Sequence, residues 1–516
     1  SVPEETVSPI KTTDAETLGD NKNSTTEWRY EDEKNGCYAE WKYDEQTQCL
    51  TIRGTGGTHN EEESQALDDY KFFEPFVDEF ENRDEVREVV IEEGITEINT
   101  AAFAGFTHLE RVSIPDSVKK IGDYVFCYCS SLQEITIPDH VKSTGKECFM
   151  GCQSLRKLVI GKRLKDIVVG SFEECLSLRD ISVKSGNPYF ETKYGGLYQR
   201  KKKILYFQYQ DTSSVSIAKD TKKIAPLAFN YHQELQNIKI PASVTEIGGG
   251  AFYQCENLRK VTFAKGSRCK ELKLYFTRYE YPEYGCFEEC KNLQEIQLPD
   301  HLRHIESECF AGCTSLEEIQ FPESLQYVGS GCFYGCTSLR ELCFPESMKG
   351  IGGISGCTSL KKVYFGEKFE GDVLSEGDYP SDLDKEDYPA YEREHRLWYF
   401  QLYGAKVLTS VEISKKNKYF SSKNGLIYDK NMEILYACPR GKKASKLRLS
   451  DSVNLICDDA FAYCKNIQAV EIPNEKAKIR SSAFRKSKHI IIYGKKKSTA
   501  EKFAGKHGMK FVAIEN

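Results

Sequence analysis

A spacing of 23 residues recurs along most of this chain and constrains its fold more than any other feature. Leucines and phenylalanines both return at this interval, and the phenylalanine runs are Phe103, Phe126, Phe149 and Phe172; Phe229 and Phe252; Phe287, Phe310 and Phe333; Phe461 and Phe484. A unit of this length is too short to bury its own apolar face, whereas stacked units can share a continuous core. The chain of 516 residues is therefore predicted to be a solenoid.

Each unit carries an apolar-x-apolar segment that often ends in proline, as in Ile135-Thr-Ile137-Pro138. This alternation predicts a short strand with one buried face, and a proline costs little where the ladder stops. About sixteen such strands would form a curved parallel sheet of roughly 75 Å at a spacing of ~4.8 Å. An Ile-Gly pair follows in many units, as at Ile121-Gly122, and predicts a left-handed turn because glycine tolerates positive φ.

The repeat resembles the BspA-like, or Treponema pallidum-type, leucine-rich repeat family. The match is close from Pro115 to Gly122 and from Pro241 to Phe252, and the resemblance covers roughly residues 86–489. It implies a mainly β solenoid of the α/β type, a right-handed superhelix of ~23-residue coils with a parallel sheet. It also implies a small β cap at the N-terminus, a βαβ-like cap at the C-terminus, and a secreted or cell-surface bacterial protein associated with adhesion and binding.

The expected layout follows from these matches. It comprises a flexible polar tail (1–27), an N-terminal β cap (28–85), repeats (86–489) with insertions at 187–210, 266–285, 367–400 and 417–441, and a C-terminal cap (490–516). The first and last insertions are similar in sequence and resemble the hairpins that such arrays carry. In the C-terminal cap, Ser498 and Glu501 form a capping box for a short helix that Gly508 can end.

Nine of the 20 cysteines occupy one position of the repeat, which predicts a ladder of structural thiols: Cys129, Cys152, Cys175, Cys255, Cys290, Cys313, Cys336, Cys357 and Cys464. A second position, directly before the phenylalanine, alternates between cysteine and alanine, as expected of a small buried slot. Stacked repeats place thiols in a line, whereas zinc needs about four converging ligands. Disulfides remain an alternative, with Cys37 and Cys49 the best candidates.

Two insertions break the repeat and carry the candidate ligand-binding tyrosines, namely Tyr275, Tyr279, Tyr281 and Tyr284 in one and Tyr379, Tyr388 and Tyr391 in the other. Tyrosine offers a large contact area with a polar end, which suits protein or glycan ligands. Packing of the insertions onto the solenoid explains these residues equally well. Residues 367–396 hold 11 acidic and 4 basic residues. Asp382 and Asp384 resemble a calcium loop, but a solvated acidic loop is favoured.

Charge and motifs narrow the function classes. The net charge of -7 gives no reason to expect nucleic-acid binding, and no apolar run reaches the ~18 residues of a membrane span. No catalytic motif such as G-x-S-x-G or H-E-x-x-H occurs. We therefore expect a non-enzymatic binding protein without cofactors, secreted or on a cell surface, monomeric, with a protein or glycan partner of which a host molecule is one source.

Two alternatives stay open. A glycan-processing enzyme could use paired carboxylates of the acidic insertion, and a passive spacer could hold another domain off a surface. Lysines also gather in the last forty residues, including Lys495 to Lys497. A basic end opposite an acidic insertion could orient a partner, although surface lysines more often serve solubility.

Overall fold

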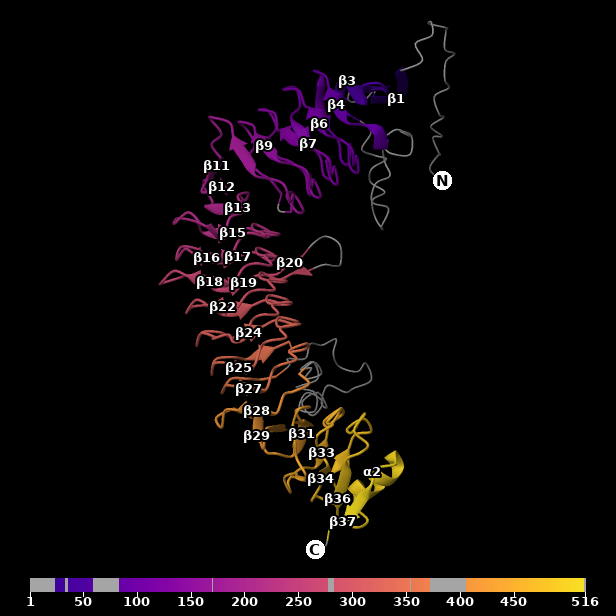
Figure 1. The fold of residues 1–516 in the computed structure, drawn as a ribbon, viewed down its shortest axis with the longest axis vertical. Coiled ribbons are helices and arrows are strands. Elements are labelled where there is room, and N and C mark those ends of the chain that lie inside the picture. The colour runs from indigo at the N-terminus through magenta and orange to yellow at the C-terminus, as the bar shows by residue number, and fades with distance from the viewer. Residues whose placement is uncertain are drawn as a thin grey trace, which may run out of the picture.

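The computed structural model describes residues 24–32, 36–58, 83–168, 170–276, 283–352, 354–371 and 405–514. Within these residues the chain is a mainly β parallel solenoid of about 17 turns with very little helix, so the predicted fold class is confirmed. Its coils stack along an arc whose two ends curve toward the same side (Figure 1).

Most coils contribute strands to two parallel series rather than one, and each series is divided into several hydrogen-bonded sheets along the array. The apolar-x-apolar strands are β4 (Glu88–Ile91), β6 (Arg111–Ser113), β8 (Glu134–Thr136), β9 (Lys157–Ile160) and β10 (Asp180–Val183), then β14 (Ser214–Val215), β16 (Asn237–Ile240), β18 (Lys260–Phe263) and β22 (Glu295–Ile296), and later β25 (Glu341–Cys343), β27 (Lys362–Phe365) and β28 (Ser410–Ile413). Strands β27 and β28 pair directly in parallel, so they belong to neighbouring coils.

The Ile-Gly segments form the second series, which the sequence interpretation had assigned to turns. Its strands are β5 (Ile95–Ile98) and β7 (Lys120–Ile121), followed by β15 (Lys223–Ile224), β17 (Glu246–Ile247), β19 (Glu271–Leu272), β23 (His304–Ile305), β24 (Tyr327–Val328) and β26 (Gly350–Ile351). In each two-residue strand the second residue points into the core, as Ile247 and Ile305 do.

The prediction of a left-handed turn at the Ile-Gly glycines was wrong. Gly122 and Gly248 lack positive φ. A Cβ on Gly122 would lie 2.7 Å from the Thr100 nitrogen, and one on Gly248 would lie 2.3 Å from the Pro226 nitrogen. These glycines are therefore required by the close approach of the preceding coil, which leaves no room for a side chain.

The left-handed residue stands instead directly before the cysteine position. Gly312, Gly335 and Gly356 have φ values of 72°, 72° and 80° there. Tyr128 and Tyr231 occupy the same position in other coils with φ values of 58° and 60°. Glycine relieves the strain of this conformation, whereas a non-glycine residue there costs roughly 1–2 kcal/mol.

Stacked phenyl rings fill the core along the solenoid axis. Phe126 and Phe149 have ring centroids 5.9 Å apart at 3°, and Phe287 and Phe310 lie 5.6 Å apart at 2°. The parallel stack is interrupted after Phe172, whose next aromatic neighbour, Phe207, is tilted by 40°. It resumes at Phe229 and again at Phe461, so the stack is divided where the hairpin insertions enter.

The nine ladder cysteines are buried, and each thiol donates a hydrogen bond to the preceding coil. The Cys313 thiol, for example, lies 3.2 Å from the Phe287 carbonyl oxygen, and the Cys336 thiol lies 3.1 Å from that of Phe310. The acceptor is a phenylalanine carbonyl in eight of the nine and Cys438 in the case of Cys464. The sequence interpretation missed this bond, because the repeat predicts a small buried residue without indicating its donor role.

The proposed Cys37–Cys49 disulfide is not formed. The strands β2 (Cys37–Asp44) and β3 (Cys49–Gly57) are antiparallel neighbours, but Cys49 pairs with Asp44 while Cys37 lies beside Gly56. Each cysteine begins its own strand, so the two lie at opposite ends of the hairpin, roughly 24 Å apart at 3.4 Å per residue.

Two hairpin insertions have the same anchor. The first comprises β11 (Phe190–Lys193), β12 (Gly196–Gln199) and β13 (Ile204–Gln208), and the second β29 (Phe420–Lys423), β30 (Leu426–Asp429) and β31 (Ile434–Ala437). Asn417 is fully buried; its amide donates to the Gly366 and Phe369 carbonyls (3.0 and 2.8 Å), and its oxygen accepts from the amides of Tyr419 and Phe420. Asn187 makes the equivalent four bonds in the first hairpin.

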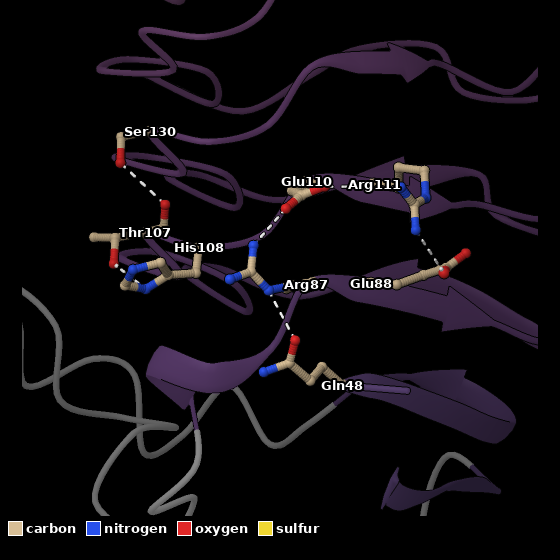
Figure 2. A network of polar contacts seen from close by, with 8 residues as sticks. All are labelled: Gln48, Arg87, Glu88, Thr107, His108, Glu110, Arg111 and Ser130. Atoms are coloured by element: carbon tan, nitrogen blue, oxygen red, sulfur yellow. Dashed lines mark hydrogen bonds and ion pairs between the residues drawn. The ribbon is translucent and has the colours of Figure 1, made fainter. Parts of the chain in front are cut away.

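The N-terminal cap continues the first sheet: β1 (Ser24–Asp32) pairs with β2, and β3 pairs with β4 after the short 3-10 turn η2 (Arg83–Glu85). Arg87 ties this cap to the repeats, because its guanidinium donates to Gln48 at 2.8 Å and pairs with Glu110 at 2.5 Å (Figure 2). Facing residues on successive strands alternate in charge through Glu88, Arg111, Glu134, Lys157 and Asp180. Opposite charges on facing strands favour this register.

The C-terminal end has the expected βαβ form. The last repeats contain β32 (Leu447–Arg448), β33 (Leu455–Ile456), β34 (Ala469–Glu471) and β35 (Lys478–Ile479). The chain then forms β36 (Ile491–Gly494), α2 (Thr499–His507) and β37 (Phe511–Ala513), and β36 and β37 are parallel neighbours. The Ser498 side chain accepts from the Glu501 amide at 3.3 Å, and Gly508 ends the helix with φ of 67°. Both predicted cap residues are therefore confirmed.

Candidate functional site

A short hairpin projects from the middle of the array on the inner side of the arc. It consists of β20 (Tyr275–Phe276) and β21 (Glu283–Tyr284), in which Tyr275 pairs with Tyr284 (Figure 1). The hairpin lies directly on two glycines of the preceding coil: a Cβ on Gly249 would meet the Tyr275 nitrogen at 1.9 Å, and one on Gly250 would meet the Tyr284 Cβ at 2.9 Å. The Gly-Gly pair thus creates the seat for the hairpin.

The same hairpin reaches back across the interruption in the phenyl stack. Tyr284 interacts with the Glu173 carboxylate, although the two residues lie 111 positions apart in the chain. Burial raises the pKa of the Tyr284 hydroxyl, and the charge of Glu173 helps to raise it further. A Cβ on Gly170 would lie 3.0 Å from the Tyr275 hydroxyl oxygen. A cavity of about 20 Å³, enough for one water, lies here between the coils of Phe172 and Pro226. The hairpin therefore links the two sides of the junction.

Three tyrosine rings continue this contact from coil to coil. The Tyr253 ring centroid lies 4.4 Å from that of Tyr284 at 45°, and 5.6 Å from that of Tyr231 in an edge-to-face arrangement. All three are half-buried, and Tyr128 on an earlier coil is 36 % exposed. We call Tyr128, Tyr231, Tyr253, Tyr275 and Tyr284 the tyrosine surface.

Carboxylates accompany these tyrosines and have unusual proton affinities. Burial raises the pKa of Glu173 to about 7, and the nearby charges of Glu147 and Glu174 raise it further, while the Tyr284 hydrogen bond opposes the change. Burial likewise raises the pKa of Glu288 to about 7, although the Gly285 amide donates to it at 2.9 Å. Burial followed by the charge of Glu173 raises the pKa of Tyr275 to about 12, so its hydroxyl stays protonated.

The arrangement suits recognition by ring faces, hydroxyls and carboxylates. Tyrosine rings contribute apolar contact with a polar end, and carboxylates accept hydrogen bonds from hydroxyl or amide donors of a ligand. Within the described ranges, no group of three or more His, Cys, Asp or Glu residues could hold a metal ion. The same part of the chain contains no helix long and apolar enough to cross a membrane.

Of the seven tyrosines predicted from the sequence, the structure brings Tyr275 and Tyr284 together. Tyr279, Tyr281, Tyr379, Tyr388 and Tyr391 lie outside the described residues, as do Asp382 and Asp384 of the acidic insertion.

Sequence reasoning missed Tyr128, Tyr231, Tyr253 and Glu173. Their signal was only partial. Tyr128 and Tyr231 align with Gly312, and Tyr253 and Glu173 align with Ala311, but other coils place Glu174 or Tyr334 at the same positions.

Comparison with curated proteins finds no match. Among solved structures, a leucine-rich repeat protein from Eubacterium ventriosum is 21% identical over 67% of this chain and 95% of its own length, with a TM-score of 0.45. A leucine-rich repeat protein from Bacteroides ovatus is 19% identical over 97% of this chain and 100% of its own length, with a TM-score of 0.43. A leucine rich cell surface protein from Faecalibacterium prausnitzii is 19% identical over 92% of this chain and 96% of its own length, with a TM-score of 0.35.

A family model identifies the repeat. The description "BspA type Leucine rich repeat region (6 copies)" matches residues 77–194, 203–278, 280–371 and 433–503, which together exceed half of the chain. The stacked coils, the thiol ladder and the two parallel series of strands are the physical counterpart of that repeat, and the chain belongs to the BspA-type leucine-rich repeat family.

Proposed function

We propose that this protein is a non-enzymatic binding protein, secreted or held at a cell surface, that engages a protein or glycan ligand through the tyrosine surface. Membership of the repeat family supports a binding or surface role. The finer assignment to this surface depends on one observation. Tyr128 and Tyr231 occupy a left-handed backbone position that glycine fills in some coils, as at Gly312, and polar residues such as Glu174 and Gln254 fill in others.

Those two residues have φ values of 58° and 60°, where Gly312 and Gly335 both have 72°. A tyrosine in the left-handed region costs roughly 1–2 kcal/mol relative to glycine, and local strain of this kind gathers at binding sites. Tyr128 is 36 % exposed, so part of its ring is available to a ligand. Ligand contact by the ring supplies a reason for retaining it.

The experiment compares the parent chain with a Y128G/Y231G variant on arrays of glycans and extracellular proteins. Glycine already occupies this position at Gly312 and Gly335, so the variant should fold, and relief of strain should partly offset the lost ring packing. We expect the variant to lose about tenfold or more in affinity for whichever ligand the parent binds, because interface tyrosines often contribute more than 1 kcal/mol.

Tyr334→Ala is the matched control, since Tyr334 is 60 % exposed on a later coil outside the tyrosine surface. It should bind like the parent. Equal affinity of the parent and the Y128G/Y231G variant would refute the assignment, as would a loss of similar size in Tyr334→Ala. Turnover of a bound glycan by the parent would refute the non-enzymatic role.

A further inference from the structure

The C-terminal coils carry a charge opposite to that of the rest of the chain. Residues 405–514 hold 24 Lys and Arg against 9 Asp and Glu, a net of +15, whereas the whole chain has -7. The remaining residues therefore carry -22. Charge of one sign gathered at one end of an elongated molecule creates a strong local potential.

Most of the arginines in this region are engaged within the protein. The Arg485 guanidinium bonds both carboxylate oxygens of Asp459 at 2.7 and 2.6 Å. The Arg448 side chain bonds Glu471 at 3.0 Å and Asp451 at 2.6 Å, and Arg440 covers the Tyr463 ring at 4.2 Å. These charges are partly neutralised, so they contribute less to an external ligand.

Lysines supply the uncompensated charge, and several fall in register along the solenoid. Lys442, Lys465 and Lys488 each follow the cysteine position of successive coils, an alignment fixed by the pairing of Ala444 with Ile467 and the stacking of Phe461 on Phe484. Lys465 and Lys488 are exposed and Lys442 is half-buried. Within the described part of the chain, none of these three forms an ion pair.

Upstream coils show that the fold does not require lysine at this position. The equivalent residues are Thr107, Ser130, Gln153, Leu176, Gln233, Glu256, Lys291, Thr314, Thr337 and Thr358, with one lysine among the ten. The Thr314 hydroxyl even bonds the Lys291 carbonyl of the coil before it at 3.1 Å. Like charges stacked at a coil spacing of ~4.8 Å repel each other, so a lysine row is unfavourable unless something compensates it.

The terminal coil extends this basic surface. Lys502 and Lys506 are exposed on one side of α2, four residues apart, and Lys495, Lys496 and Lys510 are exposed on either side of the helix. Glu501 is the acidic residue of this segment, and its carboxylate accepts from the Lys497 amide. The row of three lysines thus continues into an end surface of the same sign.

We propose that the last coils bind a linear polyanionic glycan, a sugar chain bearing sulfate or phosphate groups, along the row of Lys442, Lys465 and Lys488. A row of point charges at regular spacing matches a linear polymer with repeated anions. Lysine ammonium groups contact such groups without the bidentate geometry that arginine would impose. This surface is separate from the tyrosine surface, so the inference goes beyond the proposed function.

Two other polyanions fit the surface less well. Single-stranded nucleic acid is bound by cationic grooves that offer aromatic rings for base stacking, but Arg440 already covers the Tyr463 ring and Lys446 covers the Tyr493 ring at 4.2 Å. Helices that lie on membranes expose apolar side chains beside their lysines, whereas Ala500, Phe503 and Ala504 of α2 are buried.

The test measures binding of a size-defined heparin oligosaccharide to the full chain between 50 and 300 mM NaCl. The K442T/K465T/K488T variant installs the residue that Thr314, Thr337 and Thr358 already place at this position, so it should fold like the parent. We expect its affinity at 50 mM NaCl to fall about tenfold and the slope of log K against log salt to decrease by about 2, for three lost contacts. K442R/K465R/K488R should keep the affinity.

The matched control is K119T/K142T/K222T, which removes three exposed lysines from another repeat position, one that Thr245 fills in a neighbouring coil. It should bind heparin like the parent, and so should Y128G/Y231G, whose ligand is tested separately. Unchanged heparin binding by K442T/K465T/K488T, or an equal loss in the control, would overturn the proposal. So would tighter binding to a 20-nucleotide single-stranded DNA or to phosphatidylserine vesicles than to heparin.

Discussion

Replacing the buried asparagine at the base of either hairpin should loosen the array locally and severely. In Asn417→Ala, the carbonyls of Gly366 and Phe369 lose their donor, and the amides of Tyr419 and Phe420 lose their acceptor. Each bond contributes about 1 kcal/mol net, and each stranded buried partner adds a desolvation cost of about 1–3 kcal/mol. Because the site can relax in part, we expect a loss of about 3–4 kcal/mol.

Asn417→Asp separates the two halves of this role. The aspartate keeps one oxygen for the two amides. Its second oxygen replaces the amide nitrogen and faces the Gly366 and Phe369 carbonyls, which need donors. A buried carboxylate facing carbonyls has a raised pKa. Its contribution to stability is therefore present at low pH and is lost as the pH rises through the folded-state pKa, so Asn417→Asp should be more stable at pH 5 than at pH 8.

Hydrogen exchange read by peptide is the suitable assay, because long repeat arrays do not unfold in one cooperative step. A loss of about 3 kcal/mol lowers protection roughly a hundredfold. Asn417→Ala should show this loss at residues 366–371 and 405–437, and Asn187→Ala should show it near residues 161–208. Asn237→Ala, which removes an exposed side chain, is the control and should change protection little. Losses below threefold, or equal losses in all coils, would refute the anchoring role.

Two further predictions test the interior. In the parent, the free energy of unfolding should fall as the pH rises from about 4.5 to about 7, because the folded state holds the proton of Glu173 more tightly than the unfolded chain does. Glu173→Gln should reduce this fall, as measured by denaturant titrations at pH 5 and pH 8. A variant with the same pH profile as the parent would contradict the assignment. Under a thiol-labelling reagent, exposed Cys343 should react first and the ladder thiols only on unfolding, as read by mass spectrometry; early labelling of Cys313 would contradict the burial that raises its pKa.

The fold was predictable from the sequence because the same residue type returns at the same position in many coils. Phe103 and Phe126 differ by the same 23 residues as Phe461 and Phe484, and a single spacing therefore specified the stacking. The role of the Ile-Gly glycines was not predictable in the same way. Positive φ and close approach both select glycine, and the sequence alone does not distinguish them. The distances from Gly248 to Pro226 decide in favour of close approach.

The candidate site was predictable only in part, for a physical reason. Tyr275 and Tyr284 were found because they interrupt the count of 23. Glu173 lies in an ordinary coil, and its contact with Tyr284 depends on how far the hairpin extends across the junction. That reach is a tertiary property, which the periodicity does not contain. The aligned residues of other coils, Ala311 and Glu288, do not identify the partner of Glu173.

The division of charge along the solenoid has a consequence for how the two surfaces act together. The tyrosine surface is accompanied by Glu147, Glu173, Glu174 and Glu288, whereas the last coils carry +15. A polyanion is repelled by the first surface and attracted by the second, so each surface discriminates against the ligand of the other. About five coils at ~4.8 Å separate Tyr284 from Lys442, the nearest members of the two surfaces, which is roughly three times the ~8 Å Debye length at physiological salt. Ligands at the two surfaces should therefore bind with independent affinities, and one chain could hold a polyanionic glycan at its end while its middle engages a different molecule.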